Sequence, residues 1–158
     1  MDVLRLALIL VLAAAPGTLA CSFGFTDING ECLEFHPELL VPWQDAVTYC
    51  QNGTQTVLAS VKNADTLRDV YTYILTYGLT GSFWLGASDL ELEGDWSWLD
   101  GTRVDRGTPF WAIHTGLFGW DHEPNGGTDQ NCLALDSERL YYFNDADCSS
   151  LFHPICME

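Results

Sequence analysis

Six cysteines constrain the fold of this chain more than any other feature of its sequence. They are Cys21, Cys32, Cys50, Cys132, Cys148 and Cys156, and all of them lie beyond residue 20. An even count in an exported chain is typical of a disulfide framework, and six cysteines can pair into three disulfides in 15 ways. Such a framework leaves no free thiol to act as a nucleophile.

The amino-terminal segment predicts export. Arg5 precedes the apolar stretch LALILVLAAA, and the small residues PGTLA follow directly before Cys21. This is the layout of a secretory signal peptide, and the apolar stretch is shorter than the roughly 20 residues that a membrane-spanning helix needs. We therefore expect a signal peptide over residues 1–20, one domain over residues 21–158, an extracellular product and no membrane insertion.

The composition narrows the possible functions. A formal net charge of −16 argues against nucleic acid and anionic membranes as partners, because both need a basic surface, and it suits the binding of cations. The sequence contains neither a G-x-S-x-G elbow nor the H-x-x-x-H spacing of a zinc helix, so it predicts no enzyme. The tripeptide NGT marks Asn52 as a possible N-glycosylation site.

Two segments of the first half predict helices. In VPWQDAVTYC, Pro42 suits a first helical turn, and the apolar residues Trp43, Ala46, Val47 and Cys50 share one face.

The second segment, NADTLRDVYTYILTYG, repeats apolar residues at helical spacing, with Asn63 or Asp65 as its cap and Gly78 as its stop. The residues of its apolar face are Leu67, Val70, Tyr71, Ile74 and Leu75.

The pattern changes after Gly81. The runs SFWLGASD, DWSWLDG, NCLALD, LYYFND and LFHPICME predict short strands. Between them lies a long irregular region, residues 101–131, whose aromatic residues favour an ordered loop: Phe110, Trp111, Phe118 and Trp120. The sequence therefore predicts an α+β domain that carries a large loop.

One acidic stretch imitates a calcium-binding helix–loop–helix. In DLELEGDWSWLD, the carboxylates of Asp89, Glu91 and Glu93, then Gly94 and Asp100, fall at the spacing of such a loop. The flanking segments SFWLG and GTRVDRGTPFW do not read as helices, so this interpretation is rejected.

Two other short motifs offer oxygen ligands. The segment HEPNGGTDQNC contains Glu123 and Asn125, and the segment FND contains Asn144 and Asp145. Ca²⁺ prefers six to eight oxygens from carboxylates, amides and carbonyl groups. Each motif alone reads as an ordinary turn, but each also lies near a cysteine, and a disulfide could bring the two together.

The ordered series WLGASD, WSWLDG, EPN and FND, with the cysteine spacing, resembles the C-type lectin domain family over the whole of residues 21–158. The resemblance implies that family's fold: two helices, two small antiparallel sheets, a long calcium- and sugar-binding loop region, and an added N-terminal hairpin. It also implies three disulfides, which are Cys21–Cys32, Cys50–Cys156 and Cys132–Cys148.

The resemblance also implies a Ca²⁺ whose remaining coordination positions are filled by two neighbouring sugar hydroxyls. The ligands of both the ion and the carbohydrate would be Glu123, Asn125, Gln130, Asn144 and Asp145. Pro124 would follow a cis peptide bond. Gln130 stands where sugar-binding members usually have Glu, so we expect weaker calcium binding. The E-P-N order implies mannose-type ligands, namely mannose, N-acetylglucosamine, glucose or fucose.

An auxiliary calcium site of the family is matched by Asp89 and Glu93 only. Its other positions are uncharged, so we expect that site to be empty or very weak. The remaining motif residues have structural interpretations: Trp84, Trp96 and Trp98 as core residues, Trp120 as packed under the loop, and His122 as solvated.

By analogy with the family, the sequence predicts a secreted lectin that recognises microbial surface glycans in innate immunity. Because one monosaccharide site binds weakly, avidity would need clustered glycans or a homo-oligomer. Two alternatives remain open: a calcium-independent protein-binding domain of the same fold, and an acidic matrix protein that binds mineral through its charge.

Overall fold

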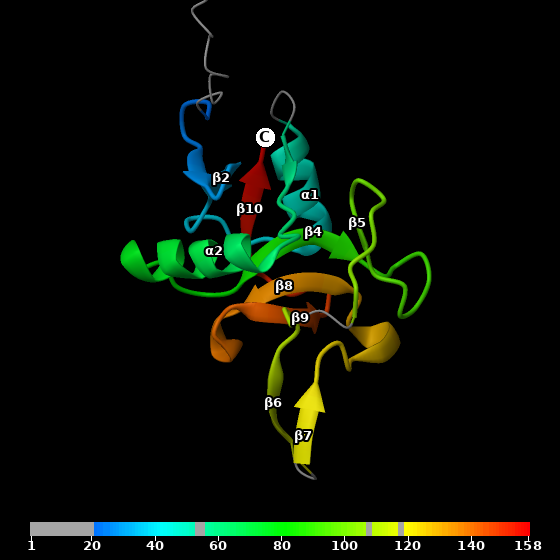
Figure 1. Ribbon diagram of the computed structural model, residues 1–158. Coiled ribbons are helices and arrows are strands. Elements are labelled where there is room, and N and C mark those ends of the chain that lie inside the picture. The colour runs from blue at the N-terminus through cyan, green and yellow to red at the C-terminus, as the bar shows by residue number, and fades with distance from the viewer. Residues whose placement is uncertain (1–20, 53–55, 107–108, 117–118) are drawn as a thin grey trace, which may run out of the picture.

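The computed structural model describes residues 21–52, 56–106, 109–116 and 119–158 (Figure 1). The described strands are β1 (Thr26–Ile28), β2 (Glu31–Phe35), β3 (Val57–Leu58), β4 (Phe83–Ser88), β5 (Ser97–Trp98), β6 (Ile113–Gly116), β7 (Gly119–His122), β8 (Cys132–Asp136), β9 (Tyr142–Ala146) and β10 (His153–Met157). The helices are α1 (Trp43–Gln51) and α2 (Ala64–Thr76), with short 3-10 turns η1 (Gly127–Asp129) and η2 (Ser137–Arg139). This confirms the predicted α+β class.

Strand β10 joins the two halves of the main sheet. The strand order is β1-β2-β10-β4-β8-β9, with β3 beside β10 and β5 beside β4. All of these pairings are antiparallel except β10 with β4, which is parallel. Strands β6 and β7 form a separate two-stranded sheet that extends away from the body in Figure 1. The structure therefore has two sheets, as expected, and the larger sheet is continuous through β10.

Both helices bury the faces that their apolar spacing predicts, with one exception. In α1 the buried residues are Trp43, Ala46, Val47 and Cys50. Helix α2 begins after Asn63, whose side chain accepts a hydrogen bond from the Thr66 N–H, and it buries Leu67, Val70 and Ile74. Leu75 is 56% exposed, so its assignment to the buried face was wrong. Its neighbour Ile74 occupies the buried direction at 0% exposure, and Leu75 lies on the more exposed side of the helix.

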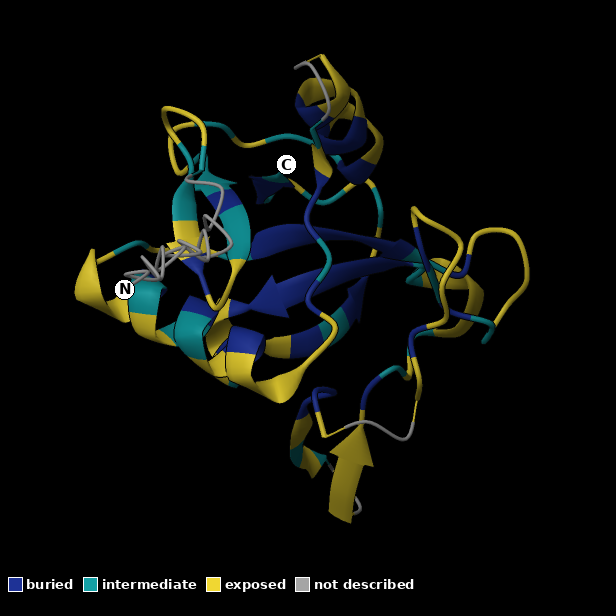
Figure 2. Ribbon diagram, turned by 45° about the horizontal axis from the view of Figure 1, so that its top comes forward, coloured by how far each residue is buried: buried dark blue, intermediate teal, exposed yellow. Residues whose placement is uncertain are grey.

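The core lies between the helices and the central strands. Every residue of β8 is buried, as are five of the six in β4, and both strands appear dark blue in the centre of Figure 2. Trp84, Trp96 and Trp98 are buried, as predicted. Two of them also bind the main chain or stack: the Trp84 indole N–H donates to the Val41 carbonyl (2.8 Å), and Trp98 lies edge-on to Phe143.

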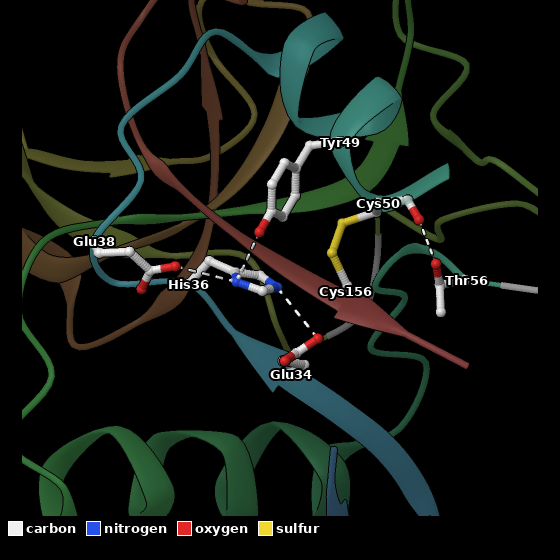
Figure 3. Close-up of a disulfide and its surroundings, with 7 residues drawn as sticks. All are labelled: Glu34, His36, Glu38, Tyr49, Cys50, Thr56 and Cys156. Carbon is white, nitrogen blue, oxygen red and sulfur yellow. Dashed lines mark hydrogen bonds and ion pairs between the residues drawn. A yellow bond between two sulfur atoms is a disulfide. The ribbon is translucent and has the colours of Figure 1, made fainter. Parts of the chain in front are cut away.

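Three disulfides cross-link the described domain, in the pairing that the family resemblance implies: Cys21–Cys32, Cys50–Cys156 and Cys132–Cys148. Figure 3 shows Cys50–Cys156, which joins α1 to β10. Beside it, His36 contacts Glu34 (3.4 Å), Glu38 (3.3 Å) and the Tyr49 hydroxyl (3.3 Å). These contacts connect the N-terminal hairpin to α1.

The region predicted to be irregular, residues 101–131, contains the β6–β7 hairpin. Phe110 and Trp111 are buried in the core, as an ordered loop requires, and Phe118 lies outside the described residues. Trp120 is 70% exposed on β7, so the prediction that it packs under the loop was wrong. Antiparallel pairing with β6 places Trp120 opposite Thr115, away from the core.

The proposed signal peptide, residues 1–20, lies outside the described residues. Among those described, no helix has the length and apolar character needed to span a bilayer. Asn52 is exposed at the C-terminal end of α1, and the Thr of its NGT sequence lies outside the described residues.

Candidate functional site

A short ladder of main-chain hydrogen bonds places the EPN segment beside β9. The Glu123 N–H donates to the Ala112 carbonyl (3.0 Å), and the Ala112 N–H donates to the Phe143 carbonyl (2.9 Å). The Phe143 N–H in turn donates to Phe110 (2.7 Å). Phe143 directly precedes Asn144 in β9, so the two candidate ligand motifs meet although some twenty residues separate them.

The turn after Glu123 wraps around the carboxylate of Asp145. The Glu123–Pro124 peptide bond is cis, the isomer that the family resemblance implies. The next two N–H groups point at Asp145: Asn125 donates to Oδ2 at 3.0 Å, and Gly126 donates to the same oxygen at 2.6 Å. Asp145 is 1% exposed, whereas Asn125 is exposed. The loop is thus built on one buried anion and presents its amide side chain to solvent.

Gln130 lies in the same loop. Its N–H donates to Gly127 (3.1 Å), which closes the η1 turn. Its side chain covers Gly126 so closely that a Cβ on Gly126 would lie 2.0 Å from Gln130 Oε1. The glycine is therefore required for Gln130 to reach into the loop. Asn144 is half-buried on β9, opposite Ala134 and next to Asp145.

Glu123 is a buried carboxylate with basic side chains on one side. It is 5% exposed, and its Oε1 lies 3.2 Å from Arg139 Nε and 3.4 Å from His114 Nδ1. Arg139 also pairs with Asp136. The second oxygen of Glu123, Oε2, has no hydrogen-bond donor among the described residues. Burial, and then the neighbouring Asp145 carboxylate, raise the pKa of Glu123 to about 7, although Arg139 opposes this rise.

The donor set fits a hard divalent cation. Two buried carboxylates lie side by side and one of their oxygens lacks a donor among the described residues. Asn125 and Gln130 belong to the same loop, and Asn144 is next to Asp145 on β9, so three amide side chains are available beside them. Oxygen donors of this kind are the ligands that Ca²⁺ prefers, and a cation would relieve the crowding of like charge. The residues predicted as ligands are therefore compatible with Ca²⁺.

The candidate auxiliary site is a cavity of 280 Å³ that adjoins this loop; it is lined in part by Asp89, Glu93 and Arg106, and it shares Asn125 and Asp145 with the loop. Asp89 is buried and Glu93 is exposed. Burial raises the pKa of Asp89, and the hydrogen bond from the Gly94 N–H opposes the rise.

Sequence reasoning missed the basic residues at these two sites. Arg139 and His114 contact Glu123, and Arg106 lines the neighbouring cavity. No motif spacing connects any of them to the EPN segment. One sequence feature could have pointed to the two arginines. Lysine and arginine are rare in this acidic chain, and two of its six lie at these sites. His122, on β7, is exposed, as predicted for a solvated residue.

Comparison with known proteins identifies one family over most of the chain. The profile of the Lectin C-type domain matches residues 40–158. Perlucin from Haliotis laevigata is 30% identical over 86% of this chain and 81% of its own length. Human C-type lectin domain family 17, member A, is 27% identical over 87% of this chain. These relatives agree with the expectation that the chain is not an enzyme.

Solved structures share the fold. Human lithostathine superimposes with a TM-score of 0.69 at 23% identity, covering 91% of this chain and 94% of its own. A calcium-independent type II antifreeze protein gives a TM-score of 0.68 at 22% identity, covering 88% and 94%. The present chain spans only 32% of the length of human C-type lectin domain family 17, member A, and 51% of the length of mouse CD209 antigen-like protein D.

Proposed function

The chain belongs to the C-type lectin domain family, a family of carbohydrate-binding domains, and from that premise we propose that it is a secreted, calcium-dependent lectin of mannose-type specificity. The observation that carries the proposal is the meeting of two buried carboxylates, Glu123 and Asp145, beside the exposed amide group of Asn125. A purely structural role does not account for that arrangement, because two adjacent carboxylates repel each other.

The residues of the loop would bind both the ion and the sugar. Glu123, Asn125, Gln130, Asn144 and Asp145 would hold Ca²⁺, which supplies coordination positions for two neighbouring sugar hydroxyls. The carboxylate oxygens accept hydrogen bonds from those hydroxyls, and the amide groups of Asn125 and Asn144 donate to their lone pairs. Asn125 is exposed and can reach a ligand without movement of the core.

The mannose-type class rests on the order of acid and amide across Pro124. Each sugar hydroxyl must meet an acceptor on one side and a donor on the other, so exchanging the two side chains changes which pair of hydroxyls is favoured. Glu123 followed by Asn125 is the order implied for mannose, N-acetylglucosamine, glucose and fucose, and the reverse order is implied for galactose.

The test is affinity chromatography of the purified chain on mannose resin and on galactose resin, in millimolar Ca²⁺ and again with chelator. We expect retention on mannose only, and only with Ca²⁺. The double variant Glu123→Gln with Asn125→Asp should move retention toward galactose. Asp145→Asn should abolish retention on both resins, while Asp45→Asn, an exposed change on α1, should leave it intact.

A folded protein that is retained on neither resin would contradict the proposal. It would favour the alternative of a calcium-independent protein-binding domain, for which two observations speak. Gln130 removes one negative charge from the loop, and the fold is shared with a calcium-independent antifreeze protein. The mineral-binding alternative rests only on the net charge of −16.

The biological setting is proposed on the family alone. We also propose export, on the signal-peptide layout of residues 1–20, and microbial surface glycans in innate immunity as the targets. Because single sites bind monosaccharides weakly, we propose that clustered glycans or a homo-oligomer supply avidity.

A further inference from the structure

The cavity beside the calcium loop is strongly acidic on one side. Among the residues that line its 280 Å³ are the carboxylates of Asp89, Glu93 and Asp145. Asp145 belongs to the candidate calcium site, so this cavity shares a wall with it. The fourth charged residue of the lining is Arg106.

Asp89 is a buried anion that is only half satisfied. It is 3% exposed, and its Oδ2 accepts a hydrogen bond from the Gly94 N–H at 2.8 Å. Its Oδ1 is buried and has no hydrogen-bond partner in the part of the chain that the structure describes. A buried carboxylate in this position needs a positive charge nearby, because an uncompensated charge is costly to bury.

Arg106 reaches into the same cavity from the segment that follows β5. Its guanidinium group donates to the Pro124 carbonyl (3.3 Å), which belongs to the cis-proline turn. The same group approaches Gly94 so closely that a Cβ there would lie 3.3 Å from the other terminal nitrogen. One guanidinium therefore spans the Asp89–Gly94 loop and the turn that carries Glu123 and Asn125.

We propose that Arg106 is a positioning residue that supplies a permanent positive charge to this cavity in place of a second metal ion. A guanidinium stays protonated at any physiological pH and offers several donors in a fixed plane. It can thus offset Asp89 and Glu93 and bind the Pro124 carbonyl at the same time. The inference rests on the proposed function, since the turn that Arg106 holds is the one proposed to bind calcium.

The charge of Arg106 should limit the number of Ca²⁺ ions that the chain binds. A divalent cation entering the cavity would face the positive charge of Arg106, so the unaltered chain should bind one Ca²⁺ and no more. Removal of that charge leaves three carboxylates facing one space. The variant Arg106→Gln should therefore bind two Ca²⁺, the second more weakly than the first.

The experiment is equilibrium dialysis of the full folded chain with ⁴⁵Ca²⁺ up to 10 mM. The matched control is Arg103→Gln, which removes the same charge from the same segment; Arg103 is paired with Asp95 and does not line this cavity. We expect one ion per chain for the control, two for Arg106→Gln, and one for Arg106→Lys. In chelator, Arg106→Gln should also be cut faster by protease within residues 119–131 than the control.

The inference is overturned if the unaltered chain binds two ions, a result that requires no variant. It is equally overturned if Arg106→Gln binds the same number as the unaltered chain. Failure of the proposed function gives a different result: the unaltered chain would bind no Ca²⁺. In that case Arg106→Gln would still gain one ion under the present inference, and a gain of none would refute it.

Discussion

At the scale of single residues, Gln130 sets the charge of the candidate calcium loop. Its side chain already lies against Gly126, so a carboxylate of nearly the same shape can occupy its place. We expect Gln130→Glu to tighten Ca²⁺ binding about tenfold, or about 1.4 kcal/mol, because affinity rises with the charge of the ligands. Calorimetric titration checks this, with the exposed substitution Gln44→Glu as the control; equal affinities in both variants would contradict it.

Arg139 governs the same site when calcium is absent. It is the guanidinium partner of the buried Glu123 carboxylate, at 3.2 Å. Without it, the buried Glu123 carboxyl of the ion-free chain would have no strong partner, whereas bound Ca²⁺ would supply one. Arg139→Gln should therefore lower the unfolding free energy by about 1–3 kcal/mol in chelator and by less in Ca²⁺.

Thermal unfolding with and without Ca²⁺ measures this difference. Arg68→Gln is the control, because Arg68 pairs with Asp65 and Asp69 at the surface of α2. Equal destabilisation of Arg139→Gln in chelator and in Ca²⁺ would show that Arg139 acts only in the fold.

These residues show where sequence reasoning stops. Glu123 and Asn125 could be proposed as ligands because a short local motif carries them, and Asn144 and Asp145 for the same reason. Arg139 could not be found in this way, because its contact with Glu123 exists only after η2 and the EPN turn are brought together by the fold. No periodicity or spacing along the chain encodes that meeting.

At the scale of elements, two tryptophans in the long loop region have opposite roles. Trp111 is buried, with its ring edge-on to Trp96 at 5.2 Å and to Phe143 at 5.8 Å between ring centroids. Trp120 is 70% exposed on β7. Trp111→Ala should cost about 3–5 kcal/mol of unfolding free energy, whereas Trp120→Ala should cost little. Denaturant unfolding of both variants tests this, and similar losses would contradict the described packing.

The elements that could be predicted are those with internal periodicity. Helix α2 follows from its apolar spacing and its Asn63 cap, and only the outermost position of that pattern, Leu75, was misplaced. The β6–β7 hairpin was missed because its strands are short and wholly or half exposed, so no alternation of buried and exposed residues marks them. Trp120 was misplaced for the same reason, because aromatic character alone does not distinguish a core residue from an exposed one.

At the scale of the whole molecule, the C-terminal strand β10 joins the first and the later strands into one sheet. The last strand pairs with β2 along one edge and with β3 and β4 along the other, so residues from both ends of the domain share one sheet. The candidate calcium loop lies between β5 and β8, and this sheet supports it at both ends. In such an architecture, strands formed elsewhere in the chain fix the two ends of the loop.

Two of the disulfides should contribute differently to the unfolding free energy. Cys50–Cys156 closes a separation of 106 residues, and Cys21–Cys32 closes one of 11. On the chain-entropy account, the longer closure stabilises by roughly 4.7 kcal/mol and the shorter by about 3 kcal/mol. The double variant Cys50→Ala with Cys156→Ala should therefore unfold at a lower denaturant concentration than Cys21→Ala with Cys32→Ala. The larger loss should fall on the whole domain, since β10 would be released from α1, whereas loss of the shorter bridge frees only the N-terminal hairpin. If the two variants unfold at the same midpoint, closure through β10 is not what stabilises the domain.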